Sequence, residues 1–174
     1  MLRKMLKTAG CAALLPIVMA AAPAQAQVTR IKTNPSAFIL DGVRVAPGNE
    51  IYFLSGQLAS PIDPAKATTM EDFGDTKTQT VSVLNKIKKQ LESQGYSIKD
   101  VVKMTLFIAA DPKLGKIDFA GANAGFKEFF GSAENPDTVA RSAFQVANLV
   151  APQFLIEIEA IAAKKPAPAA KPKK

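Results

Sequence analysis

Two strand-like runs near the C-terminal end carry the residues that could do chemistry. Side chains alternate along a β-strand, so Arg141 and Ala143 project from one side of the run 138–147. Glu157 and Glu159 project from one side of the next run. If the two runs pair as a hairpin, one guanidinium and two carboxylates share a sheet surface. That surface is either a site that acts on a ligand or a cross-strand ion pair that only fixes strand register.

Missing residue types narrow the chemistry further. The 174-residue chain has no histidine, and its single cysteine is Cys11. Ser–His–Asp and Cys–His catalysis are therefore excluded, as is a zinc site built from histidine and cysteine. No glycine-rich phosphate loop is present. We expect no cofactor and no metal. Carboxylate, arginine, lysine, tyrosine, hydroxyl, amide and backbone groups remain for catalysis.

The elements that must position these residues follow from hydrophobic periodicity. The pattern predicts strands and two helices in the order βββ-α-β-α-ββ. The predicted strands are 27–32, 37–45, 50–54, 101–109, 138–147 and 153–162. This order, without regular βαβ repetition, predicts an α+β fold with one mixed six-stranded sheet and both helices on one face. The uncovered face would then carry Arg141 together with apolar residues, which is typical of a subunit interface.

The two helices have clear limits in the sequence. The first is capped by Asp75 or Thr76 and ends at Gly95. Its apolar stripe comprises Val81, Leu84, Ile87 and Leu91. The second runs from about 118 to 130, and its aromatic residues are interpreted as core. This second buried stripe comprises Phe119, Ala122, Phe126 and Phe130.

The first 26 residues have the layout of a secretory signal peptide. Three basic residues precede an apolar stretch, and Ala24-Gln25-Ala26 supplies small residues before a cleavage point. We expect cleavage after Ala26 and a periplasmic or secreted protein. An uncleaved membrane anchor is the alternative, but the apolar run is short and rich in alanine. We therefore expect no stable membrane insertion.

The other end, residues 164–174, consists of lysine, proline and alanine and is predicted to be a disordered tail. It is either simply solvated or weakly attracted to an anionic surface. The net charge of +7 arises at the two ends, which hold eight basic residues and no acidic ones. Residues 27–163 therefore carry a net charge of −1 and form one domain, with no basic excess for nucleic acid.

An ordered set of motifs from Ile51 to Ala162 resembles the Rid family, the YjgF-type reactive-imine deaminases. The pieces that carry the resemblance are Ser55-Gly56-Gln57, the run Asp100-Val101-Val102-Lys103-Met104-Thr105-Leu106-Phe107, the helix from Phe119 to Phe130, Ala140-Arg141-Ser142-Ala143-Phe144-Gln145-Val146-Ala147-Asn148-Leu149, and Ile156-Glu157-Ile158-Glu159-Ala160-Ile161-Ala162. The resemblance implies a chorismate-mutase-like fold and a homotrimer with sites in the clefts between subunits.

The resemblance also implies roles for particular residues. Arg141 would hold the carboxylate of a small imine or ketoacid, which suits its planar fork of donors. Glu157 would hold or activate the attacking water and assist proton transfer. Ser55, Gly56 and Asn123 would line the pocket. The implied reaction is hydrolysis of 2-aminoacrylate-like enamines and imines to 2-oxo acids and ammonia.

This chain departs from the family pattern at several positions. Ile39, with Phe38 beside it, stands where many members have a tyrosine. Ala143 replaces a common cysteine near the pocket, and Val139 replaces a common proline. Two other functions therefore remain open: a non-catalytic trimeric module that binds a small carboxylate, and a chaperone-like interaction protein. A ribonuclease is disfavoured by the charge of the domain and the missing histidines.

Overall fold

The computed structural model describes residues 27–167. The expected signal peptide and residues 168–174 of the expected tail lie outside this range. The elements in chain order are β1 (Val28–Ile31), β2 (Gly42–Val45), β3 (Glu50–Leu58), η1 (Met70–Asp72), α1 (Thr76–Ser93), η2 (Ile98–Asp100), β4 (Val101–Ile108), α2 (Phe119–Lys127), β5 (Ala140–Gln145) and β6 (Ile156–Lys164). The predicted order βββ-α-β-α-ββ is confirmed.

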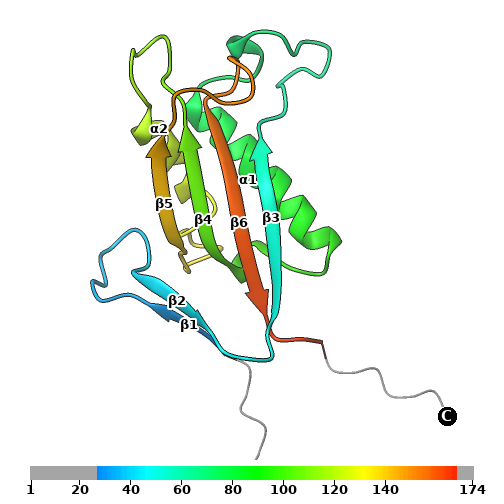
Figure 1. Cartoon of the computed structure of the whole chain (residues 1–174), viewed down its shortest axis with the longest axis vertical. Helices are drawn as coiled ribbons and strands as arrows, with labels where there is room; N and C mark the ends of the chain where they lie inside the picture. The colour runs from blue at the N-terminus through cyan, green and yellow to red at the C-terminus, as the bar shows by residue number, and fades with distance from the viewer. Residues whose placement is uncertain (1–26, 168–174) are drawn as a thin grey trace, which may run out of the picture.

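The core is one layer of four strands with both helices on one of its faces (Figure 1). The strand order is β3-β6-β4-β5, in which β4 runs parallel to β5 and antiparallel to β6. The side chains of β4 and β6 that point toward the helices are buried: Met104, Leu106, Ile108, Ile156, Ile158 and Ala160. The alternate side chains of β6 point to the open face. The predicted α+β class, with two helices and a mixed sheet, is confirmed.

The prediction of a single six-stranded sheet was wrong. β1 and β2 form their own antiparallel hairpin, which lies beside the four-stranded sheet (Figure 1). A short contact joins the two sheets, since the Leu40 N–H donates to the Val139 carbonyl at 3.0 Å and Leu40 bridges Ala140. Each strand of the hairpin has four residues. Strands this short can form a separate ribbon, and alternation alone does not assign a strand to a sheet.

The predicted pairing of the last two strands as a hairpin was also wrong. β4 lies between β5 and β6 and forms ladders with both. The reason is visible in β4 itself, where five of eight side chains are buried, as expected for a central strand. α2 lies in the connection from β4 to β5, so these two parallel strands form a crossover unit.

The first helix follows its sequence signals closely. Asp75 is the N-cap, and its carboxylate accepts a hydrogen bond from the Thr78 N–H at 2.8 Å. Leu84, Ile87 and Leu91 are fully buried, whereas Val81 is only partly buried. Gly95, with a φ of +72°, lies just beyond the helix in the left-handed region that favours glycine. No helix among residues 27–167 is long and apolar enough to cross a membrane.

Lys164 is the last residue of β6, and it pairs with Glu50 of β3. Its ammonium donates to the Gly95 carbonyl at 2.6 Å and lies 4.1 Å from the centroid of the Tyr96 ring. Lys164 is therefore part of the domain, one residue beyond the boundary expected from the sequence.

Replacing Asp75 with alanine tests the helix cap. Hydrogen bonds from the backbone and side chain of Thr78 lower the pKa of the Asp75 carboxyl below its usual value. The cap therefore contributes stability above the unfolded-state pKa of about 4, and this contribution is lost as the pH falls through the lower folded-state pKa. We expect Asp75→Ala to cost about 1 kcal/mol at neutral pH. Urea denaturation of wild type and variant across pH should show the difference shrinking in acid, and a constant difference would contradict the assignment.

Candidate active site

Arg141 is partly buried between β5 and α2, and its recess is the set of aromatic rings and the one amide that contact its guanidinium. The Nη2 group donates to the Asn123 Oδ1 of α2 at 2.8 Å. The guanidinium carbon lies 4.6 Å from the centroid of the Phe126 ring and 5.0 Å from that of Phe38. Phe119 is at 5.9 Å. Aromatic faces attract a guanidinium, so this surrounding orients the side chain without neutralising its charge.

The other terminal nitrogen of Arg141 has an unused hydrogen-bonding capacity. Nη1 is buried and has no hydrogen-bond partner. Within residues 27–167, no carboxylate forms an ion pair with Arg141. Burial lowers the pKa of Arg141 below its usual value, yet an arginine stays protonated in proteins. A buried cationic donor left without a partner is costly, and a carboxylate ligand would satisfy it through charge-assisted hydrogen bonds.

The resemblance implies one substrate pocket that contains Arg141, Ser55, Gly56, Asn123 and Ala143. The structure brings Arg141, Asn123 and Ala143 together. Asn123 is partly buried in the middle of α2 and reaches Arg141 directly. Ala143 lies two residues after Arg141 on β5, so both side chains project from the same face, and Ala143 packs against the core. A small side chain there leaves room beside the guanidinium.

A second group of predicted residues lies where β3 meets β6. The register between these strands shifts between Leu54 and Gln57, which creates a β-bulge at Ser55 and Gly56. The Glu157 side chain fills the space beside Gly56, since a Cβ added at position 56 would collide with its carboxylate oxygen and lie 2.8 Å from its carboxyl carbon. At position 56 the Glu157 side chain, rather than the backbone angle, limits the space for a larger residue. Ser55, Gly56 and Glu157 therefore form one cluster.

The two groups lie on opposite faces of the sheet, which corrects the expectation that Arg141 and the glutamates share the uncovered face. Ile156 and Ile158 are buried toward the helices, so Glu157 between them points to the open face. Arg141 instead points toward α2. Because β4 lies between β5 and β6, two strand spacings of about 4.8 Å also separate their backbones. The cross-strand ion pair considered as an alternative is therefore absent.

The open face of the sheet carries exposed apolar side chains. The largest are Phe53, Phe144 and Ile51, which are 71%, 54% and 49% exposed. A hollow of about 320 Å³ on this face is lined by Phe53, Ser55, Lys103, Thr105, Glu159 and Ile161, among others. Lys103 donates to the Ser142 hydroxyl at 2.8 Å, and this places Ser142 on the same face. An apolar surface of this kind is typical of a contact with another protein chain.

The aromatic recess of Arg141 was only partly predictable. Phe126 is buried as expected, but the prediction that Phe119 belongs to the buried stripe was wrong, because it is 44% exposed near Arg141. Phe38 was singled out in the sequence as the neighbour of Ile39, and the structure places its ring against both Arg141 and Phe126. Its spacing of more than one hundred positions from Arg141 gave no signal of this contact. No group of three or more acidic residues in the described part of the chain is arranged to hold a metal.

The comparison with protein families identifies the chain. A family model described as Endoribonuclease L-PSP matches residues 42–164, which is most of the domain. The chain belongs to the Rid/YjgF/RutC family. The matched residues include Ser55, Gly56, Asn123, Arg141 and Glu157.

Relatives agree with this membership, and a solved structure shares the fold. A RutC family protein from Pyrococcus horikoshii is 41% identical over 69% of this chain and 83% of its own. A protein from Escherichia coli named 2-iminobutanoate/2-iminopropanoate deaminase is 36% identical over 68% of this chain and 82% of its own. The crystal structure of a Rid family protein from Yersinia pestis, 22% identical, matches the fold with a TM-score of 0.60 over 79% of this chain and 98% of its own.

Gly56→Ala tests the contact between the bulge of this Rid family member and Glu157. The added methyl group must displace the Glu157 carboxylate, the movable end of a flexible side chain. We expect unfolding free energy within about 1 kcal/mol of wild type but loss of any activity that needs Glu157 in place. Thermal unfolding and an imine-hydrolysis assay would check this. Full activity in Gly56→Ala would show that the position of the carboxylate does not matter.

Proposed function

We propose that this protein hydrolyses small 2-imino and enamino acids, such as 2-aminoacrylate, to 2-oxo acids and ammonia. The observation that carries the proposal is the buried Nη1 of Arg141, a cationic donor without a partner in a recess that holds no carboxylate. A ligand that supplies a carboxylate would complete it. Relatives at 35–36% identity, named 2-iminobutanoate/2-iminopropanoate deaminases, support the same reaction.

The chemistry requires little beyond these side chains. The enamine tautomerises to its imine, and Arg141 fixes the substrate carboxylate. Glu157 accepts a proton from water as the oxygen adds to the imine carbon, and the proton passes to the nitrogen. Collapse of the tetrahedral adduct transfers its hydroxyl proton to the amino nitrogen, breaks the carbon–nitrogen bond and releases ammonia and the 2-oxo acid. The imine carbon is already electrophilic, so no covalent nucleophile is needed.

The complete site would be shared between copies of the chain. Arg141, Asn123 and Ala143 lie on the helix side near one edge of the sheet, whereas Ser55, Gly56 and Glu157 lie toward the other edge. One copy cannot bring both groups to one ligand. A neighbouring copy can place its Glu157 opposite Arg141, and the exposed apolar residues of the open face would be buried in the contact. We propose a homotrimer with three such clefts, as the family resemblance implies.

We further propose that the protein works outside the cytoplasm after signal cleavage near Ala26. Its substrates would then be imines released by oxidation of amino acids in the cell envelope. Incubating the purified protein with imino acids generated by an amino-acid oxidase tests the substrate class. Mass spectrometry of the exported protein tests the processing, and a mature N-terminus far from Gln27 would contradict it.

A non-catalytic module that binds a small carboxylate is the second candidate. The same feature of Arg141 favours this binding module, since Nη1 without a partner would bind a 2-oxo acid equally well. Glu157 separates the two functions because binding alone does not require it. In a chaperone-like protein the basic tail would matter instead, and removal of residues 165–174 would abolish the effect while leaving Lys164 and its contacts in place.

Replacing Arg141 tests the carboxylate grip. Arg141→Ala is expected to lower kcat/KM for imine hydrolysis about 100-fold, since hydrogen bonds to charged groups contribute about 1.5–3 kcal/mol. Imino acids would be generated in place and trapped by semicarbazide in competition with the enzyme. Arg44→Ala, at an exposed arginine of β2, is the matched control and should behave as wild type. Equal rates for wild type, Arg141→Ala and blank across several side chains would favour the binding module.

Glu157→Gln distinguishes catalysis from binding. Removal of a general acid–base is expected to lower kcat by about 100-fold or more. The affinity for 2-oxobutanoate, measured by calorimetry, should change by less than about threefold because Arg141 still holds the carboxylate. An unchanged kcat in Glu157→Gln would remove the proposed role of Glu157.

A further inference from the structure

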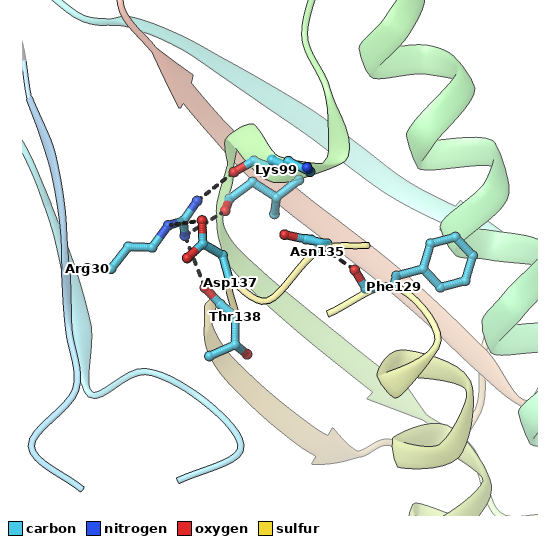
Figure 2. Close-up of polar contacts among 7 residues, drawn as sticks. Arg30, Lys99, Phe129, Asn135, Asp137 and Thr138 are labelled. Carbon is cyan, nitrogen blue, oxygen red and sulfur yellow. Dashed lines mark hydrogen bonds and ion pairs between the residues drawn. The ribbon is translucent and has the colours of Figure 1, made fainter. Parts of the chain in front are cut away.

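Arg30 of β1 is the most connected side chain outside the candidate active site. Its Nη1 group donates to the carbonyls of Val101 and Thr138 at 3.1 and 3.0 Å, and its Nη2 donates to the carbonyl of Lys99 at 2.6 Å. Figure 2 shows the guanidinium between the segments that carry these carbonyls. One side chain thus joins three parts of the chain: the β1–β2 hairpin, the start of β4 and the segment that leads into β5.

The segment before β5 continues from this contact to the recess of Arg141. The Thr138 hydroxyl donates to the Phe38 carbonyl at 2.9 Å, and the Leu40 N–H donates to the Val139 carbonyl at 3.0 Å. Phe38 then packs its ring 5.0 Å from the Arg141 guanidinium. Two hydrogen bonds therefore connect Arg30 to Phe38 through Thr138, and Thr138 lies three residues before Arg141.

We propose that Arg30 is a positioning residue for the carboxylate site, holding Phe38 and the start of β5 so that Arg141 faces its ligand. The inference rests on the proposed function of Arg141 as the carboxylate grip. The hairpin that carries Arg30 belongs to a separate two-stranded sheet, and its segment between the strands also contacts the domain through Leu40 and Phe38. Arg30 and Phe38 both precede residue 42, where the family match begins.

The carbonyl contacts, rather than the ion pair with Asp137, carry this role. The Arg30 Nε lies 3.7 Å from the Asp137 carboxylate, whose side chain is 57% exposed. An exposed pair of this kind contributes little. Three carbonyls at separate places need the planar fork of a guanidinium, and the single ammonium of lysine cannot satisfy them together. Asp137→Asn should therefore behave almost as wild type, and Arg30→Lys should resemble Arg30→Gln.

The experiment compares Arg30→Gln with Arg44→Gln in the full chain. Arg44 lies on the other strand of the same hairpin, opposite Thr29, and is exposed with no side-chain hydrogen bond in the described structure. The measurements are hydrogen exchange of the peptides that span 36–41 and 138–141, the Kd for 2-oxobutanoate, and kcat and KM for oxidase-generated imines. Unfolding of part of the population would lower kcat and leave KM unchanged, whereas a misplaced carboxylate grip raises KM and Kd.

We expect Arg30→Gln to speed exchange in both peptides and to raise Kd and KM about tenfold, with kcat within about twofold of wild type. Arg44→Gln should match wild type in every measurement. Unchanged exchange in Arg30→Gln, or a Kd equal to that of Arg44→Gln, overturns the proposal, and so does a wild type that binds no 2-oxo acid. A wild type that binds 2-oxobutanoate but hydrolyses no imine contradicts the proposed activity alone, and its Kd values still test Arg30.

Discussion

The parallel pairing of β5 with β4 determines most of what this structure can do. Met104 and Arg141 are partners in that ladder, and Met104 is fully buried beneath the helices. Arg141 must therefore enter the same layer, where its charge meets aromatic rings and one amide but no acid. A pairing with β6 instead would have brought arginine and glutamate together and satisfied both within one chain. The observed pairing leaves the cation without a charged partner among the described residues, and this is the feature on which the proposed carboxylate site rests.

The glutamate side of the site depends on a different local feature. The Glu157 carboxylate occupies the space that a Cβ at position 56 would need, and Gly56 lies in the β-bulge between Leu54 and Gln57. The bulge re-aims the backbone locally, as bulges near functional sites commonly do. In the proposed site, one chain supplies only one of the two residue groups. Assembly would then do more than add stability, because it would bring the two groups together.

The sequence predicted the elements better than their arrangement. Asp75, Gly95 and the apolar spacing of α1 are local signals, and the helix appears where they indicate. The candidates Arg141 and Asn123 proved to be in contact, as did Glu157 and the bulge. Which strand pairs with which is a long-range property, and alternation within a strand only defines two faces without saying which one the helices cover. The Arg141 face was misassigned for that reason. Arg30 donates to backbone carbonyls, and because every residue has one, the sequence does not indicate which carbonyls it contacts.

Lys164 gives the domain a definite end. Three features of this residue fix the last position of β6: its backbone pairing with Glu50, its bond to the Gly95 carbonyl and its contact with Tyr96. The residues that follow therefore start from a fixed point at the end of the β3–β6 pair. An affinity tag or fluorescent label attached after Lys165 would therefore start from a fixed origin, away from the β5 edge that carries Arg141. A truncation that removes Lys164 would instead remove an anchor that links the sheet to the end of α1.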